Sequence, residues 1–286
     1  MHQYNYADMN ILIFTILIWA ASLIAGFLGA LTGLGGGVVI VPLLTLVFGV
    51  DIRYAIGASL ISVIATSSGA ASAYVKEGFS NIRIGMFLEV ATTLGALLGA
   101  FIATKLSTSV IAIIFGLILI HSSYLTIKRI SESQLAIKPD PLATRLKFDG
   151  AYPVAGGSES YHVQGVPQGF SIMFLAGSIS GLLGIGSGAV KVLAMDQAMR
   201  IPFKVSTATS NFMIGVTAAA GAGIYLNRGY IDPVLAMPVI LGVLLGSLLG
   251  ARHLFEAETK NLRLIFSAII LLLAIEMIYS GIKGYH

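Results

Sequence analysis

The sequence predicts an all-α membrane protein that spans the bilayer several times and consists of two homologous halves. The chain of 286 residues is 56% hydrophobic and only 10% charged, its apolar runs follow one another at regular intervals, and the series repeats after a polar stretch. A water-soluble domain carries about 25% charged residues. The composition therefore excludes a soluble enzyme, a nucleic-acid-binding protein and a disordered linker protein.

The first half, residues 1–128, contains four long apolar runs and one short one. A helix that spans the hydrocarbon core needs about 20 apolar residues. The short run, Val38–Phe48, would cover only about half of that thickness at roughly 1.5 Å per residue. The runs, in order, are Ile11–Leu31, Val38–Phe48, Ile56–Val75, Ile84–Thr104 and Val110–Ile127.

The second half, residues 169–286, repeats this series, and its second run is again the short one. A polar stretch, residues 129–168, separates the halves and is either a flexible linker or a small folded cap. Counting the short runs or leaving them out gives about 8 to 10 membrane segments. The runs of the second half are Phe170–Leu183, Ala189–Met199, Val205–Leu226, Val234–Ala251 and Leu264–Tyr279.

An ungapped internal alignment supports the repeat. Residues 26–100 align with residues 177–251, and 19 of the 75 pairs are identical. Two related halves with interrupted helices at corresponding positions are typical of secondary transporters, which hold the substrate between the halves. The identical pairs include Gly33/Gly184, Gly35/Gly186, Gly37/Gly188, Ser59/Ser210, Thr66/Thr217, Gly95/Gly246 and Gly99/Gly250.

The positive charges predict the topology. If each half has five membrane elements and the N-terminus lies outside, one side receives twelve Lys and Arg residues, including five in residues 128–168, and the other receives four. This asymmetry agrees with the positive-inside rule and makes the central stretch a cytoplasmic loop. Five elements per half also make the repeats inverted, whereas four full spans per half would make them parallel. The four positive residues on the side with fewer charges are Arg53, Lys105, Arg228 and Lys283.

A glycine cluster precedes each short run, at residues 33–37 and 184–188. Irregular backbone at membrane depth is tolerated only where it is buried in protein or lines a wet cavity. The helix that follows offers free N–H groups and a partial positive charge, which favour an anion. Close helix packing would explain one such cluster, but two at equivalent positions indicate a site for a small anion. The GxxxG spacings at Gly95–Gly99 and Gly246–Gly250 are typical of helix packing instead.

Polar residues near the clusters complete the predicted site. Hydroxyl and amide groups can donate hydrogen bonds to an oxyanion, although most hydroxyls within membrane helices bond their own backbone. Lys191 lies within an apolar run, where an ionisable residue is a functional candidate. The candidate substrate-binding residues are Gly33, Gly35, Gly36, Gly37, Ser59, Thr66, Gly184, Gly186, Ser187, Gly188, Lys191, Ser210, Asn211 and Thr217.

Lys191 has a structural alternative, which is pairing with Asp196, Glu89 or Glu276, or snorkelling to the interface. Glu89 and Glu276 also lie in apolar runs. Either glutamate could take up and release a proton if transport is coupled to protons. A location at a helix end would indicate a structural role instead. A proton or sodium gradient is a plausible energy source. The residues contain no metal-ligand constellation, no Walker motif and no nucleophile triad, so we expect no cofactor, no metal and no enzymatic activity.

The ordered motifs resemble the TauE/SafE family of membrane transporters. The resemblance covers nearly the whole chain and rests on the glycine motif and proline at Gly29–Pro42, Ala58–Leu60, Gly78 and Gly95–Ala100. It implies a plasma-membrane transporter for sulfite, sulfoacetate or another organosulfonate, commonly an exporter. The second half departs from the motif, with Ser187 within the cluster, Leu193 in place of the proline and the additional Lys191.

Together, these features predict alternating-access transport of a small anion about a midplane site. The residues alone support an anion, and the sulfur-containing class comes from the resemblance. A passive anion channel and a membrane assembly or scaffold protein are the alternatives. The expected partners are the anion and the lipid bilayer, without nucleic acid, and a homo-oligomer is open.

Overall fold

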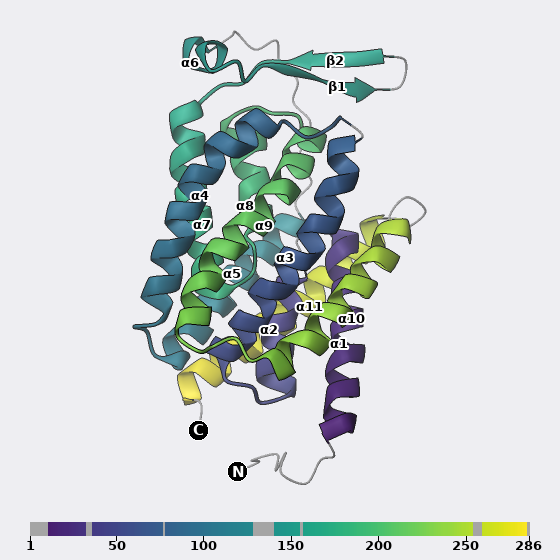
Figure 1. Ribbon diagram of the computed structural model, residues 1–286, viewed down its shortest axis with the longest axis vertical. Coiled ribbons are helices and arrows are strands. Elements are labelled where there is room, and N and C mark those ends of the chain that lie inside the picture. Colours follow the sequence, from purple (N-terminus) through teal and green to yellow (C-terminus); the bar gives the residue numbers. More distant parts are fainter. Residues whose placement is uncertain are drawn as a thin grey trace.

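The computed structural model describes residues 11–32, 36–76, 78–127, 140–154, 157–253 and 259–284. The chain is mostly helical, as the apolar runs predict (Figure 1). Among the described residues, α4 (Ile82–Ala103) and α7 (Val166–Leu183) are long and apolar enough to cross a membrane, and shorter apolar stretches lie in other helices. Two of the predicted site residues, Gly33 and Gly35, lie outside the described residues.

The first half consists of four long helices and one short one. They are α1 (Ile11–Thr32), α2 (Gly37–Pro42), α3 (Ile52–Lys76), α4 and α5 (Thr108–Ile127), and a π-helical turn, η2 (Leu43–Val47), continues α2. The second half has the same order: α7, α8 (Gly188–Leu193) with its π-helical turn η3 (Ala194–Ala198), α9 (Phe203–Asn227), α10 (Pro233–His253) and α11 (Thr259–Lys283). The two short runs therefore form short helices, as expected.

Equivalent turns in the two halves share an unusual backbone conformation. Gly78, after α3, has φ +76°, and Gly229, after α9, has φ +72°. Gly49 and Arg200, which also correspond in the repeat, have φ +63° and +57°. Glycine adopts this left-handed region without the steric cost that a side chain brings, so Arg200 is strained where Gly49 is not. The similarity of the halves thus extends to turns where the sequences differ.

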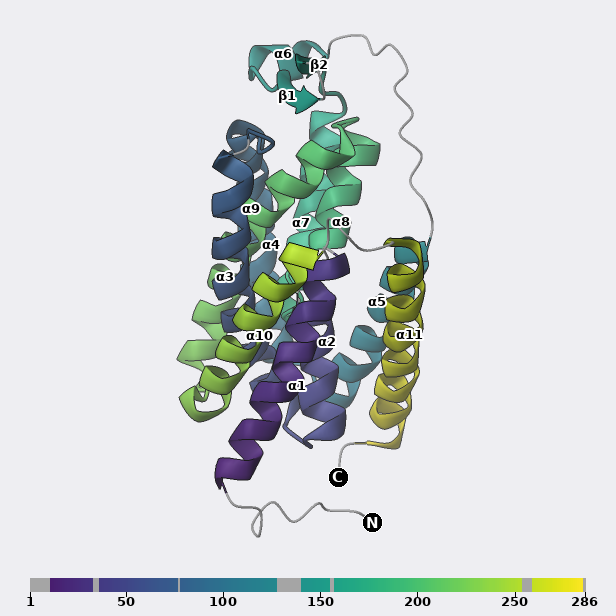
Figure 2. The ribbon, with the colours of Figure 1, turned by 90° about the vertical axis from the view of Figure 1, so that its right-hand side faces the viewer.

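Each long helix of one half packs against a long helix of the other. α1 packs against α10 and α4 against α7, which are equivalent pairs, while α3 packs against its counterpart α9 and α5 against its counterpart α11. Figure 2 shows α5 and α11 side by side. Most of the packing between long helices is therefore between the halves.

Glycines allow two of these helix pairs to approach closely. A Cβ atom at Gly95 or Gly99 of α4 would overlap the carbonyl oxygens of Phe174 and Ser178 of α7. A Cβ atom at Gly246 of α10 would overlap the carbonyl oxygen of Leu23 of α1. Small residues at such contacts let helix backbones meet, which is the packing role that the GxxxG spacing predicts.

Part of the polar central stretch folds into a cap at one end of the helices (Figure 1). It contains the short helix α6 (Pro141–Arg145) and the antiparallel strands β1 (Gly150–Val154) and β2 (Gly157–Tyr161). This hairpin is a correction to the all-α prediction. The sequence did not indicate it, because strands of five residues in a polar segment give only a weak periodic signal.

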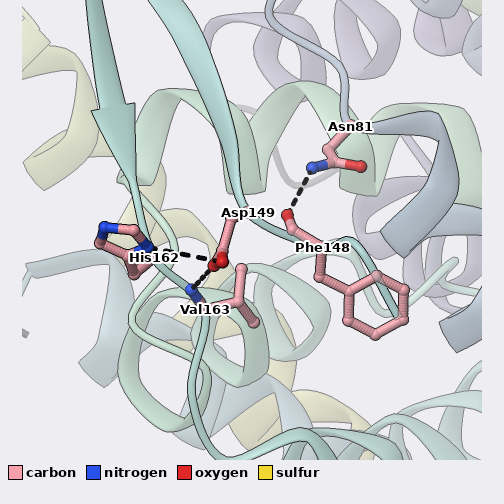
Figure 3. Close-up of polar contacts among 5 residues, drawn as sticks. All are labelled: Asn81, Phe148, Asp149, His162 and Val163. Atoms are coloured by element: carbon pink, nitrogen blue, oxygen red, sulfur yellow. Dashed lines mark hydrogen bonds and ion pairs between the residues drawn. The ribbon is translucent and has the colours of Figure 1, made fainter. Parts of the chain in front are cut away.

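Asn81, at the start of α4, joins the cap to the helices (Figure 3). Its Nδ2 donates hydrogen bonds to the carbonyl oxygen of Phe148 at 3.1 Å and to the Tyr161 hydroxyl at 2.8 Å. Within the cap, Asp149 accepts a bond from the Val163 amide at 2.9 Å and lies 3.4 Å from His162 Nδ1. Burial raises the pKa of the Tyr161 hydroxyl, which keeps it neutral in this contact.

Candidate functional site

The two interrupted segments meet between the halves. The Ser59 hydroxyl of α3 donates a hydrogen bond of 2.7 Å to the carbonyl oxygen of Gly184, at the end of α7. A Cβ atom at Gly37 would lie 2.7 Å from Ser59 Oγ and 2.8 Å from that same carbonyl oxygen. The first residue of α2 is therefore glycine because the carbonyl oxygen of Gly184, in the second glycine cluster (residues 184–188), leaves no room for a side chain.

The second break needs residues that adopt positive φ. Gly184 and Gly186 have φ +69° and +73°, and Ser187, a residue with a side chain, has φ +46°. The Ser187 hydroxyl is buried and has no hydrogen-bond partner among the described residues. Ser210 of α9 donates a bond of 3.3 Å to the carbonyl oxygen of Gly188. The break is thus held by α9 and carries one unused buried hydroxyl.

Lys191 of α8 contacts a carboxylate through a threonine. Its Nζ donates a hydrogen bond of 2.5 Å to Thr217 Oγ1 of α9, and that hydroxyl lies 2.7 Å from Glu89 Oε1 of α4. The Lys191 side chain is 0% exposed and Glu89 is 8% exposed. A buried charge is costly unless it is paired, so the two ions stabilise each other across the hydroxyl. We call Lys191, Thr217 and Glu89 the charged triad.

The surroundings of the Glu89 carboxylate are only partly polar. Thr93, one turn along α4, donates a bond of 3.2 Å to Oε1. Oε2 is buried and accepts no hydrogen bond from the described residues. Sequence reasoning missed Thr93, although its spacing of four residues from Glu89 places the two on one helical face.

Other predicted site residues lie apart from the triad or are satisfied locally. The Thr66 hydroxyl bonds the carbonyl oxygens of Ser62 and Val63 on its own helix, and the Asn211 amide bonds the carbonyl oxygen of Thr207. Gly36 is buried against a side chain of α10, and Gly186 packs against α9 and α3. Glu276 of α11 is exposed on the outside of the helices. The structure therefore brings Lys191 together with Glu89 and leaves Glu276 separate.

The helix-terminus part of the anion prediction carries less weight than the sequence indicates. α2 and α8 each have only six residues, so few aligned peptide dipoles contribute to a partial charge at their N-termini. The positive charge of Lys191 is the stronger attraction for an anion in this region. A polar cavity of about 220 Å³ lies elsewhere, between the α3–α4 turn and the cap, next to Asn81 and Tyr161.

Three relatives resemble the chain over nearly its full length. The probable membrane transporter protein YunE of Bacillus subtilis is 29% identical and the alignment covers 94% of this chain and 98% of that protein. A second Bacillus subtilis protein, the probable membrane transporter protein YdhB, is 25% identical over 83% of this chain and 87% of its own length. A probable membrane transporter protein of Methanocaldococcus jannaschii is 24% identical over 92% and 95%.

No solved structure shows significant similarity to the chain. The model of the family described as Sulfite exporter TauE/SafE matches residues 18–277, which include both halves and the cap. A transporter family of this kind implies a transported substrate and a membrane location rather than an enzymatic activity. The chain therefore belongs to the TauE/SafE sulfite exporter family, and its relatives are described as probable membrane transporter proteins.

Proposed function

We propose that this protein is a secondary transporter that exports a small sulfur-containing anion, such as sulfite, sulfoacetate or another organosulfonate, by alternating access. The observation that carries the proposal is the charged triad. Lys191 is fully buried next to the break at Gly184–Gly188, and its partners come from both halves. A cation in such a place is expensive to bury even when Glu89 neutralises it, and binding an anion is the function that we propose for it.

The arrangement of the helices supports alternating access between inverted repeats. α4 and α7 both begin at the end that carries the cap, whereas their counterparts α10 and α1 begin at the opposite end (Figure 1). In such folds, one repeat rocks against the other around a fixed central site. Because Lys191 is inaccessible in the present conformation, motion between the halves is the step that would expose it to either side.

We place the protein in the plasma membrane. The positive-inside rule supports an orientation in which the cap lies in the cytoplasm. Arg53 lies 2.8 Å from the carbonyl oxygen of Leu106 and stacks over the Tyr230 ring, so the turns that carry few positive charges meet at the end opposite the cap. The sulfur-containing substrate class and the direction of export rest on the family description. The direct test of orientation is to fuse to the cap a reporter that is active only in the cytoplasm. We expect this fusion to be active.

A binding screen on the purified, detergent-solubilised protein tests the substrate class. We would measure thermal unfolding with sulfite, sulfate, thiosulfate, sulfoacetate, taurine and simple carboxylates. A bound ligand at a hundredfold excess over its Kd stabilises the folded protein by about 2.7 kcal/mol. We expect sulfite or a sulfonate to give the largest shift and Lys191→Met to abolish it.

Lys105→Gln is the matched control, because Lys105 lies in the α4–α5 turn and stacks over the Phe101 ring. It should keep the anion response of the original protein. A preference for carboxylates would contradict the substrate class, and the absence of any anion response would contradict the proposal. Saturable flux in liposomes that depends on a gradient would separate a transporter from the alternative, a passive channel.

A further inference from the structure

The charged triad breaks the internal symmetry of the protein. By the repeat alignment, Ile40 of α2 corresponds to Lys191, Thr66 to Thr217, and Ile240 of α10 to Glu89. Ile40 is fully buried and Ile240 packs against the same apolar core. In each of these two pairs, the fold holds an apolar residue in one half and a charged residue at the equivalent position of the other half. Packing therefore does not require the charges.

The two charges come from opposite halves and meet through one hydroxyl. Glu89 belongs to α4 of the first half, and Lys191 and Thr217 belong to the second. Thr217 Oγ1 accepts the hydrogen bond from Lys191 and has a single proton to donate. Two acceptors are within reach of that proton: Glu89 Oε1 at 2.7 Å and the carbonyl oxygen of Met213, on the same helix, at 3.0 Å. Glu89 thus acts as the anion that neutralises Lys191 while no substrate is bound.

No other charge in the described chain can take over this role at the site. α4 packs against α7 and α9. α7 has no ionisable side chain, and the ionisable residues of α9, Lys204 and Tyr225, lie near its two ends. Asp196, in η3, lies one turn and more beyond Lys191 and has contacts of its own. Lys191 is the cation that faces Glu89.

A substrate anion that binds Lys191 competes with Glu89 for the same cation. Once displaced, a carboxylate that is still buried has lost its compensating charge, and Oε2 already lacks a hydrogen-bond donor. A buried, unpaired carboxylate is unstable and becomes neutral by taking up a proton. Water on the side from which the anion enters supplies that proton, and opening on the far side releases both.

Building on the proposed function, we propose that Glu89 is the proton carrier of a symport: it occupies Lys191 in the empty protein and takes up one proton when the transported anion replaces it. The loaded protein holds a protonated Glu89, the Lys191 ammonium and the anion, so with one anionic group at Lys191 these three groups have the same net charge as the empty triad. One proton therefore moves with each singly charged anionic group neutralised at Lys191, in the same direction as the anion.

The full-length protein in liposomes tests this proposal with radiolabelled sulfoacetate and a pH-sensitive dye inside the vesicles. Both acidic groups of sulfoacetate are ionised near neutral pH, so the proton signal does not come from the substrate. We expect inward sulfoacetate flux to acidify the vesicle interior in proportion. Flux without acidification, or with alkalinisation, would overturn the inference while leaving anion transport intact. A protein that moves no sulfoacetate would overturn the proposed function and this inference with it.

Glu89→Gln separates the carrier role from a structural one. The amide resembles a protonated carboxyl, so the variant should bind sulfoacetate and exchange it across the membrane, while Lys191 without a counterion hinders the return of the empty protein. We expect net flux to fall by about thirtyfold or more, the factor associated with losing one partner of a buried charge pair. Glu159→Gln, in the cap, is the matched control. Net flux at the original level in Glu89→Gln would contradict the carrier role.

Discussion

Ser59 donates a hydrogen bond of 2.7 Å to the carbonyl oxygen of Gly184, and this bond links α3 of one half to the interrupted segment of the other. Gly37 fits beside both groups only because it has no side chain. The start of α2 and the second break are therefore in close contact across the two halves.

Gly37→Ala tests this contact. The added methyl would lie 2.7 Å from Ser59 Oγ and 2.8 Å from the Gly184 carbonyl oxygen, which real Cβ atoms do not tolerate, so the halves must separate slightly. We expect a loss of about 1–3 kcal/mol of stability, the usual cost of overpacking, together with a fall in transport. Thermal unfolding and liposome flux measure the two effects. Unchanged stability and flux would show that the breaks do not close on each other.

The glycines of α4 and α10 give a second prediction. Gly95→Ala and Gly246→Ala would each place a Cβ atom on backbone of the other half, and we expect each to destabilise the protein by about 1–3 kcal/mol. Gly223 of α9 is the matched control, since a Cβ atom there would meet nothing within 4 Å. Gly223→Ala should be neutral or stabilising by up to about 1 kcal/mol, because alanine favours the helix. Equal effects at all three positions would contradict the packing role.

The repeat and the short helices could be predicted from the sequence because they depend on local patterns. Apolar run length identifies α2 and α8 as short, and the glycine clusters identify the breaks. Lys191 and Glu89 stood out because ionisable residues are rare in apolar runs. Pairing with Glu89 was one of several alternatives for Lys191, and the sequence could not select it. The two residues lie about a hundred residues apart, and nothing in either run indicates that α8 faces α4. Glu276, with the same sequence signal as Glu89, is exposed.

Other features leave little trace in the sequence. Arg200 adopts the positive φ of its counterpart Gly49, and an arginine gives no indication of such a turn. The hydrogen bonds that hold the cap to Asn81 depend on the folded position of β2, which short polar strands do not reveal. An asparagine before a helix is a recognisable N-cap, and that signal would have identified the residue but not its contact with the cap.

Asn81 variants test how the cap is attached. Its Oδ1 caps α4 by accepting a bond from the Ile84 amide at 3.1 Å, while Nδ2 bonds Phe148 and Tyr161 of the cap. Asn81→Asp keeps the helix cap and loses the Nδ2 donor, whereas Asn81→Ala loses both, and the missing helix cap alone costs about 1 kcal/mol. We expect both variants to speed hydrogen exchange in residues 140–161. Protection at the original level in Asn81→Asp would show that the cap is held by other contacts.

Glu276→Gln separates the two coupling candidates. Because Glu276 is exposed on α11 and lies apart from the charged triad, removing its charge should leave anion flux and its accompanying proton movement within experimental error of the original protein. Parallel liposome measurements on Glu89→Gln provide the comparison. A loss of proton movement in Glu276→Gln with Glu89 intact would transfer the coupling role to α11.

Thr217 and Thr66 occupy equivalent positions and allow a matched comparison. Thr217 joins Lys191 to Glu89, whereas the Thr66 hydroxyl bonds only its own helix. Thr217→Val removes the bridge and leaves buried charged groups with fewer partners, which costs about 1–3 kcal/mol or more. Thr217→Ser retains the hydroxyl and should preserve most of the stability. Thr66→Val should cost less than about 1 kcal/mol, because hydroxyl bonds to the preceding turn of the same helix contribute little. Thermal unfolding of the three variants at one pH measures the differences, and an equal loss for both valine variants would show that the bridge does not stabilise the charged triad.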